Sequence, residues 1–217
     1  MIYKAVLFDL DGTLLDTLKD IAHSVDKILE RHHFPTHQLA DYRSFISDGI
    51  VMLITRSLPE DYRNESTIKA CVEEFHKTYA KRWNRMTRPY GGIIETLEKL
   101  AARNLKLAVF SNKTHDFTVK CVEEFFPNIP FDFILGQSDD IPPKPDPTGA
   151  FHIADKLGLL SNQILFVGDS AVDMKTAVAA GMFPVGALWG FKTYEELKFG
   201  GAKALIEHPK EILYFMV

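Results

Sequence analysis

The sequence predicts an α/β protein with a doubly wound parallel sheet and a helical subdomain inserted near its N-terminus. Three short apolar runs each stop abruptly at a polar residue or a Gly-Asp pair, and stretches with helical periodicity lie between them. Such runs are typical of strands that are buried on both faces of a parallel sheet. Their alternation with helices favours right-handed crossovers between neighbouring strands. The three runs cover residues 5–8, 105–110 and 164–167.

Further elements continue this alternation. Weaker strand signals occur at residues 131–135, 184–188 and 204–206. Apolar residues at helical spacing and local start and stop signals predict helices over residues 92–103, 148–157 and 170–180. The last of these helices stops at Gly181, and glycine commonly ends a helix.

One long segment near the N-terminus breaks the alternation. Between residues 17 and 83 no apolar strand run occurs, and only charged stretches with helical periodicity are present. Asp16 is positioned to cap the first of these helices. We therefore predict a sheet-bearing core formed by residues 1–16 and 84–217, with residues 17–83 inserted as a helical cap. The helices expected in the insertion cover residues 18–29, 51–57 and 68–83.

Composition and charge narrow the functional classes. The 217 residues are 46% hydrophobic and 25% charged, which is ordinary for a globular protein. The formal net charge of −4 provides no basic surface for nucleic acid. There is no signal-peptide pattern, and no apolar stretch approaches the ~20 residues that span a bilayer. The two cysteines lack metal-binding spacing. We expect a cytoplasmic protein that binds neither nucleic acid nor membrane, and its oligomeric state stays open.

Polar residues at the ends of the predicted strands are expected to meet at one edge of the sheet. Asp9, Ser111 and Asp169 each lie at such an end, where open parallel sheets bind their ligands. Asp9 and Asp11 form a pair in which one carboxylate can attack and the other can transfer a proton. A surface turn explains Asp11-Gly12, but it does not explain a second carboxylate directly after an apolar strand.

A second acidic pair and one lysine add to this edge. Asp173 follows Asp169 by four residues, which places both carboxylates on one face at the start of a helix. Helix capping is the alternative interpretation, but beside Asp9 the pair predicts a Mg²⁺ site, since Mg²⁺ prefers carboxylate oxygens, water and substrate phosphate. Lys144 lies between prolines that fix the backbone and remove competing donors. The alternative for Lys144 is a solvated side chain on a rigid surface loop.

These segments resemble the four motifs of the haloacid dehalogenase superfamily, in the expected order. Residues 9–13 are similar to the DxDGT signature, and Ser111 to the small hydroxyl residue of the second motif. Lys144 resembles the lysine of the third motif, and Asp169 with Asp173 resembles the acidic fourth motif. Within the superfamily the chain resembles the phosphoglycolate phosphatase-like group, through the stretches DLDGTLLDT, VFSNK, PPKPDP and VGDSAVDM. The match extends over nearly the whole predicted core.

The resemblance implies a Mg²⁺-dependent phosphatase that acts on a small phosphorylated metabolite, with 2-phosphoglycolate as the leading candidate. Asp9 would be the nucleophile that forms an aspartyl phosphate, and Asp11 the general acid and base. Ser111 and Lys144 would hold the phosphoryl oxygens, and Asn112 would bind substrate beside them. The implied metal site comprises Asp9, the backbone carbonyl of Asp11, Asp169 and, as the residue that orients the metal shell, Asp173.

Other functions are weighed against the phosphatase. A dehalogenase needs no general acid at Asp11, and a receiver-like module phosphorylated on Asp9 needs neither Asp11 nor a cap. A phosphonate hydrolase would need a cap lysine that forms an imine, and none is assignable. A sugar phosphomutase of the same superfamily stays open because it differs largely in the cap. Ser47 stands where the family's cap loop commonly has glycine. Substrate specificity is therefore the property that is least safely inferred from the family resemblance. Trp189 and Phe191 either line the interface with the cap or pack in the core, and the roles of Lys113 and His115 are left open.

Overall fold

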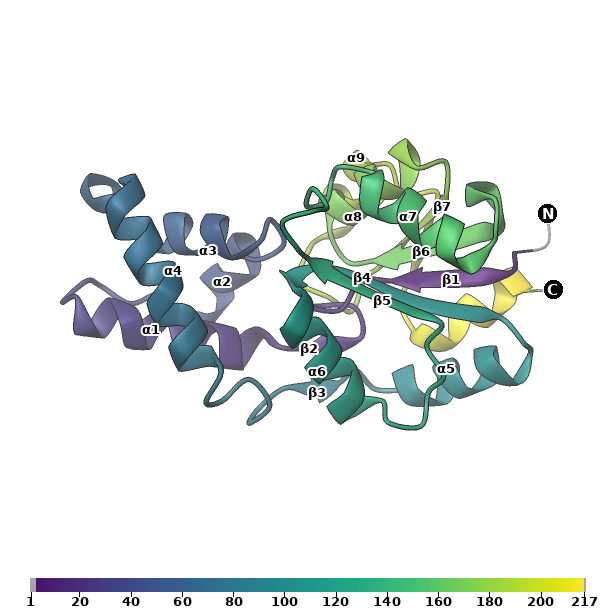
Figure 1. Ribbon diagram of the computed structural model, residues 1–217, viewed down its shortest axis with the longest axis horizontal. Helices are drawn as coiled ribbons and strands as arrows, with labels where there is room; N and C mark the ends of the chain where they lie inside the picture. The colour runs from purple at the N-terminus through teal and green to yellow at the C-terminus, as the bar shows by residue number, and fades with distance from the viewer. Residues whose placement is uncertain (1–2, 217) are drawn as a thin grey trace. The chain divides into compact units, whose positions relative to one another are not determined.

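The computed structural model describes residues 3–216, and the chain divides into two compact units (Figure 1). One unit contains the chain up to Leu15 together with everything from Pro89 onward, and the other is Asp16–Arg88. The chain passes between the units through two short strands that pair with each other, β2 (Leu15–Asp16) and β3 (Arg88–Pro89). In the described part of the chain, no helix combines the length and the apolar character needed to cross a bilayer.

The first unit contains a six-stranded parallel sheet, which confirms the predicted fold class. Its strand order is β5-β4-β1-β6-β7-β8. The chain first adds strands on one side of β1 and then crosses to add strands on the other side, so the switch point of the sheet lies at β1, where ligand sites form. The strands are β1 (Ala5–Phe8), β4 (Lys106–Thr114), β5 (Phe133–Gln137), β6 (Ile164–Gly168), β7 (Phe183–Ala187) and β8 (Ala204–Ile206).

Helices cover both faces of this sheet (Figure 1). Because both faces are covered, all four residues of β1 are fully buried and show no alternation of polar and apolar side chains. The helices α7, α8 and α9 lie on one face, and α5, α6 and the C-terminal 3₁₀ segment lie on the other. The helical bounds are α5 (Ile93–Ala102), α6 (His115–Phe125), α7 (Thr148–Leu157), α8 (Ala171–Ala179), α9 (Tyr194–Gly200) and the 3₁₀ segment (Pro209–Met216).

The structure changes several predicted boundaries in this unit. The strand expected over residues 105–110 continues to Thr114, with a register shift after Phe110, so Ser111 lies inside β4 and not after it. The residues of this extension are polar, and the apolar pattern therefore ended too early. Two helices were not predicted. The buried positions of α6 are Thr118, Cys121 and Val122, which make a weak apolar stripe, and α9 is only seven residues long.

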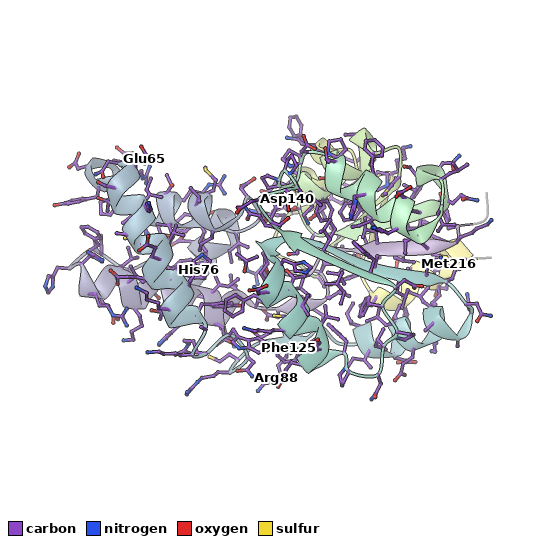
Figure 2. The ribbon with its side chains drawn as sticks, in the orientation of Figure 1. Glu65, His76, Arg88, Phe125, Asp140 and Met216 are labelled. Carbon is purple, nitrogen blue, oxygen red and sulfur yellow. The ribbon has the colours of Figure 1, made fainter. Side chains whose placement is uncertain are left out.

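The second unit is helical, as predicted. Helix α1 does not have Asp16 as its N-cap: the cap is Thr17, and Asp16 Oδ1 accepts a hydrogen bond from the Leu18 amide at 3.3 Å. Helix α4 starts at Glu65 and extends past His76 (Figure 2) to Tyr79, earlier at both ends than expected. Asn64 caps it through its side chain. The helices are α1 (Leu18–Arg31), α2 (Leu39–Phe45), which was not predicted, α3 (Ile50–Ser57) and α4 (Glu65–Tyr79).

The loop between α2 and α3 contains an unusual backbone conformation. Ser47 has a φ of 118°, a value at which glycine is favoured over residues with a Cβ. The family resemblance pointed to glycine at this position, and the observed backbone gives the physical reason for that preference. That this helical unit acts as a cap stays a prediction.

Asp20 is a charged residue buried inside the helical unit. It lies in the first turn of α1 and is fully buried. Its Oδ2 accepts hydrogen bonds from the amides of Met86 and Thr87, both at 2.8 Å, and from the Thr87 hydroxyl at 3.0 Å. Arg82 Nη2 lies 3.7 Å from Oδ1. Asp20 therefore ties the start of α1 to the segment that leads into β3.

We expect Asp20→Ala to lower the free energy of unfolding by about 3–5 kcal/mol, because buried donors lose their acceptor and Arg82 loses its carboxylate. Urea unfolding followed by circular dichroism measures the change. Asp61 is an exposed aspartate of the same unit, and Asp61→Ala is the control, with an expected change within about 0.5 kcal/mol. Equal midpoints for wild type and Asp20→Ala would show that the contacts of Asp20 contribute little.

Candidate active site

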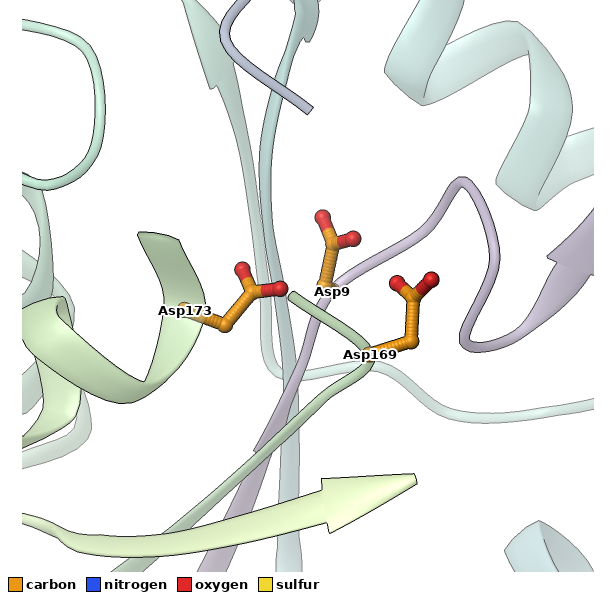
Figure 3. Close-up of side chains that lie close together, drawn as sticks. All are labelled: Asp9, Asp169 and Asp173. Atoms are coloured by element: carbon orange, nitrogen blue, oxygen red, sulfur yellow. The ribbon is translucent and has the colours of Figure 1, made fainter. Parts of the chain in front are cut away.

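Three buried carboxylates lie side by side at the carboxyl edge of the sheet (Figure 3). Asp9 follows β1, Asp169 follows β6, and Asp173 lies on the first turn of α8. One oxygen from each lies within 4.8 Å of the others. Carboxylates this close repel one another, and such a group of oxygens is suited to a divalent cation. The structure thus brings together three of the residues predicted for the metal site.

Lys144 bridges two of these carboxylates. Its Nζ lies 2.7 Å from Asp9 Oδ1 and 2.6 Å from Asp173 Oδ1, and it donates a third hydrogen bond to the Phe110 carbonyl at 2.9 Å. These contacts engage all three hydrogens of the ammonium group. Lys144 is 4% exposed. The alternative of a solvated surface lysine is therefore wrong, and Lys144 is part of the site.

Burial and mutual repulsion set the pKa values of this cluster. Burial, and next the nearby Asp173, raise the pKa of Asp9 to about 7, although Lys144 opposes the shift. Burial, followed by Asp9 and Asp173, also raises the pKa of Asp169 well above its ordinary range. Burial acts to lower the pKa of Lys144, but Asp173 and Asp9 outweigh it and raise that pKa. Added positive charge would favour the ionised carboxylates.

The two carboxylate oxygens of Asp173 have different partners, one at the start of helix α8 and one in the site. Its Oδ2 accepts hydrogen bonds from the Ser170 amide at 3.0 Å and the Ser170 hydroxyl at 2.5 Å, and its own amide donates to Ser170 Oγ at 3.2 Å. This is a capping box. Its Oδ1 pairs with Lys144. Asp173 therefore caps the helix and also belongs to the buried carboxylate cluster, and its part in holding a metal stays a prediction. Gly168 permits the approach, since a Cβ there would lie 2.3 Å from Asp173 Cβ.

Asp169 is held by residues from two other loops. The Thr13 hydroxyl donates to Oδ1 at 3.1 Å, and the Phe191 amide donates to Oδ2 at 2.7 Å. The Trp189 indole donates to the Thr13 carbonyl at 2.9 Å. The loop after β7 thus positions both Asp169 and the turn after Asp9, which gives Trp189 and Phe191 a place in the site. Gly12 is required in that turn: its φ is 92°, and a Cβ there would lie 2.3 Å from Asp169 Oδ2.

Asp11 points its carboxylate to a different partner. Lys113 Nζ lies 3.0 Å from Asp11 Oδ1 and 3.1 Å from Oδ2. Lys113 was noted in the sequence for its nearness to Ser111, but no pattern indicated that it would pair with Asp11. His115, also left open, accepts a hydrogen bond at Nδ1 from the Gly136 amide at 3.3 Å. The pairing of Lys113 with Asp11 is therefore a contact of the site that sequence reasoning missed.

Ser111 and Asn112 support the lysines of the site. The Ser111 Oγ is buried and accepts from the Lys113 amide at 3.2 Å. The Asn112 side chain donates to the Lys144 carbonyl at 3.0 Å and accepts from the Lys144 amide at 2.8 Å. Both ends of the Asn112 amide thus hold the backbone of Lys144. This contact differs from the substrate contact expected for Asn112, which stays a prediction.

The charges of the site fit a divalent cation. Four carboxylates and two ammonium groups, all ionised, leave a formal charge of −2, which one divalent cation balances. Oxygen donors without cysteine or histidine suit Mg²⁺ better than zinc or copper. The six groups are Asp9, Asp11, Asp169, Asp173, Lys113 and Lys144. Of these, Asp9, Asp169 and Asp173 are placed to hold the ion.

Fold and site together define an α/β protein with a buried cluster of carboxylates, which could hold a metal ion, at the switch point of its sheet. A family model described as haloacid dehalogenase-like hydrolase matches residues 6–187. The chain belongs to this family of hydrolases. The family resemblance seen in the sequence is confirmed, as is the prediction that the protein is an enzyme.

Individual relatives agree with this assignment. A phosphoglycolate phosphatase of Aquifex aeolicus (strain VF5) is 34% identical over 188 residues, covering 87% of this chain and 86% of the relative. A phosphoglycolate phosphatase of Pseudomonas syringae pv. tomato is 32% identical over 192 residues, covering 87% of this chain and 70% of the relative. A crystal structure from Lactobacillus delbrueckii subsp. bulgaricus has a TM-score of 0.93 at 28% identity, covering 100% of this chain and 99% of that one.

Proposed function

We propose that the protein is a Mg²⁺-dependent phosphatase that hydrolyses a small organic phosphate monoester, 2-phosphoglycolate, through an aspartyl phosphate. The observation that carries the proposal is the group of Asp9, Asp169 and Asp173 with Lys144 bound between two of them. The family and the names of the relatives support it. We propose further that the helical unit, Asp16–Arg88, is the cap that selects this small substrate.

The proposed reaction has two displacements, and the chain's own residues perform both. Asp11 begins this reaction protonated. A carboxylate oxygen of Asp9 attacks phosphorus, the ester P–O bond breaks, and the departing alkoxide takes the proton of Asp11, which is left as the carboxylate that Lys113 contacts. Water then attacks the phosphorus of the acyl phosphate, gives a proton to Asp11 and releases Asp9 as a carboxylate. The second step returns the site to its starting state.

The remaining residues of the site stabilise the charge on the phosphoryl group and orient the carboxylates. Lys144 fixes the Asp9 carboxylate and places positive charge where the phosphoryl oxygens would lie. Ser111 is proposed to contact the same oxygens, as the second motif of the family implies. Mg²⁺, when bound by Asp9 and Asp169, supplies positive charge that reduces the repulsion between the anionic nucleophile and the anionic ester. Asp173 holds Lys144 and thereby orients the cluster.

A substrate panel tests this proposal. We expect kcat/KM for 2-phosphoglycolate to exceed that for sugar phosphates, nucleotides and pyrophosphate by tenfold or more, about 1.4 kcal/mol of differential transition-state binding. Asp9→Asn protein, prepared in the same way, is the blank for contaminating phosphatases. If kcat/KM for a hexose phosphate or a nucleotide is the highest by that margin, the protein is still a phosphatase but the assignment of 2-phosphoglycolate as its substrate is wrong. Isomerisation of a sugar phosphate without release of phosphate would instead identify a mutase.

A further inference from the structure

The main chain of Lys113 is fixed next to the site. Its amide donates to Ser111 Oγ at 3.2 Å, and its carbonyl accepts from the Thr118 hydroxyl at 3.2 Å. The neighbouring strand β5 approaches closely through Gly136, where a Cβ would lie 2.7 Å from the Lys113 carbonyl oxygen. The backbone of Lys113 is thus held in place, and the side chain extends from it to Asp11.

The ion pair between Lys113 and Asp11 is largely shielded from water. The side chains are 8% and 14% exposed, respectively. Exposed ion pairs contribute little because water screens them, but that limit does not apply at this depth. The ammonium contacts both carboxylate oxygens, at 3.0 and 3.1 Å. A contact to both oxygens restrains rotation of the carboxylate, whereas a contact to one would leave it free to turn.

The charges around Asp11 make this restraint necessary. Asp11 is two residues from Asp9, and its negative charge is one of the influences that raise the pKa of Asp9. The other ammonium of the site, Lys144, donates its three hydrogens to Asp9, Asp173 and the Phe110 carbonyl. Lys113 supplies positive charge beside Asp11. Without it, repulsion from the cluster would favour turning the Asp11 carboxylate away.

We propose that Lys113 is a positioning residue for Asp11, which holds that carboxylate in the orientation needed to exchange a proton with the leaving group and with water. This inference rests on the proposed function, in which Asp11 transfers the proton. Lys113 is the last residue of the stretch VFSNK, to which the resemblance gave no role at this position, and its pairing with Asp11 is a feature of the three-dimensional structure.

The test compares two leaving groups in the first turnover. The glycolate alkoxide needs a proton as it departs, whereas the dinitrophenolate of 2,4-dinitrophenyl phosphate does not. For Lys113→Met we expect first-turnover glycolate release to slow on the order of 10–100-fold, and dinitrophenolate release to stay within about threefold of wild type. The KM for phosphoglycolate should change little. Rapid mixing and quench measure both rates.

Three further variants make the comparison specific. Asp11→Asn should show the same dependence on the leaving group, with a loss on the order of 10²–10⁴-fold for phosphoglycolate. Adding Lys113→Met to Asp11→Asn should cost no more than about twofold, because residues that act through one another are not additive. Lys113→Arg keeps a charge that can contact both oxygens and should recover most of the lost rate. It also controls for loss of folding in Lys113→Met.

The outcomes separate this inference from the proposed function. Equal losses for both leaving groups, or full additivity with Asp11→Asn, would overturn positioning. A change confined to the KM for phosphoglycolate would overturn it too and would make Lys113 a ligand of the substrate carboxylate. If Lys113→Met keeps wild-type rates while Asp11→Asn is impaired, the positioning role of Lys113 is refuted and the role of Asp11 stands. If wild type hydrolyses no ester, or Asp11→Asn matches it, the proposed function itself falls.

Discussion

Asp9→Asn is expected to reduce turnover by at least about 10⁴-fold, the scale of loss when an enzyme loses its nucleophile. The amide oxygen that replaces the carboxylate is neutral and a poor nucleophile, so no aspartyl phosphate can form. Activity on the best substrate, with and without the substitution, measures the effect. In Asp11→Asn protein supplied with an ester that has a good leaving group, mass spectrometry should find a phosphoryl group on the peptide containing Asp9.

The loss in Asp9→Asn should not come from misfolding. Burial raises the pKa of Asp9 to about 7, so the ionised carboxylate is an unfavourable group at that position, and a neutral amide of the same size is well tolerated. We therefore expect the thermal midpoint of the metal-free variant to be no lower than that of wild type. Asp155 on α7 is exposed, and Asp155→Asn is the matched control with normal activity. Near-normal rates in Asp9→Asn would mean that another group attacks phosphorus.

The strands could be predicted where the sequence pattern and the burial coincide. Strand β1 is buried throughout, so its apolar run has the same length as the strand. Strand β4 continues from Ser111 to Thr114 with polar residues, and hydrophobic periodicity carries no signal there. Helix α6 buries a threonine and a cysteine where a typical helix has leucine or isoleucine. Pattern analysis fails in both cases because the buried residues are not strongly apolar.

The residues of the candidate site also fall into two groups, those that the sequence indicated and those that it did not. Asp9 and Asp169 each follow an apolar strand, and Lys144 lies between prolines. An ordinary surface turn does not explain either of these local sequence contexts. The partners that hold these residues have no such context. Lys113 is 102 positions from Asp11, and Trp189 is 176 positions from Thr13. Sequence spacing cannot reveal such pairs, because only the order of strands in the sheet brings them together.

Removal of divalent cations is expected to abolish activity, and added Mg²⁺ should restore it. The three buried carboxylates at the end of the sheet offer oxygens within 4.8 Å of one another, and the whole site has two more carboxyl groups than ammonium groups. Burial, and next the repulsion among the carboxylates, raise the pKa of Asp9 and Asp169. Without a divalent cation the same repulsion opposes binding of an anionic ester. Dialysis against a chelator followed by titration with Mg²⁺ gives the measurement. Full activity in excess chelator would exclude the metal-dependent mechanism.

Asp169→Asn should raise the Mg²⁺ concentration for half-maximal activity by at least about 100-fold, since even outer partners of metal ligands typically contribute 10–100-fold to affinity. Thr13→Val provides a graded comparison, because it removes only the hydroxyl that donates to Asp169 Oδ1, and we expect a smaller loss, about tenfold. Calorimetric titration with Mg²⁺, without substrate, should give the same ranking, with Asp155→Asn unchanged. If Asp169→Asn bound Mg²⁺ as wild type does, the ion would be held elsewhere. The acidic cluster at the end of β1 and β6 would then have to act on phosphate through its lysines alone.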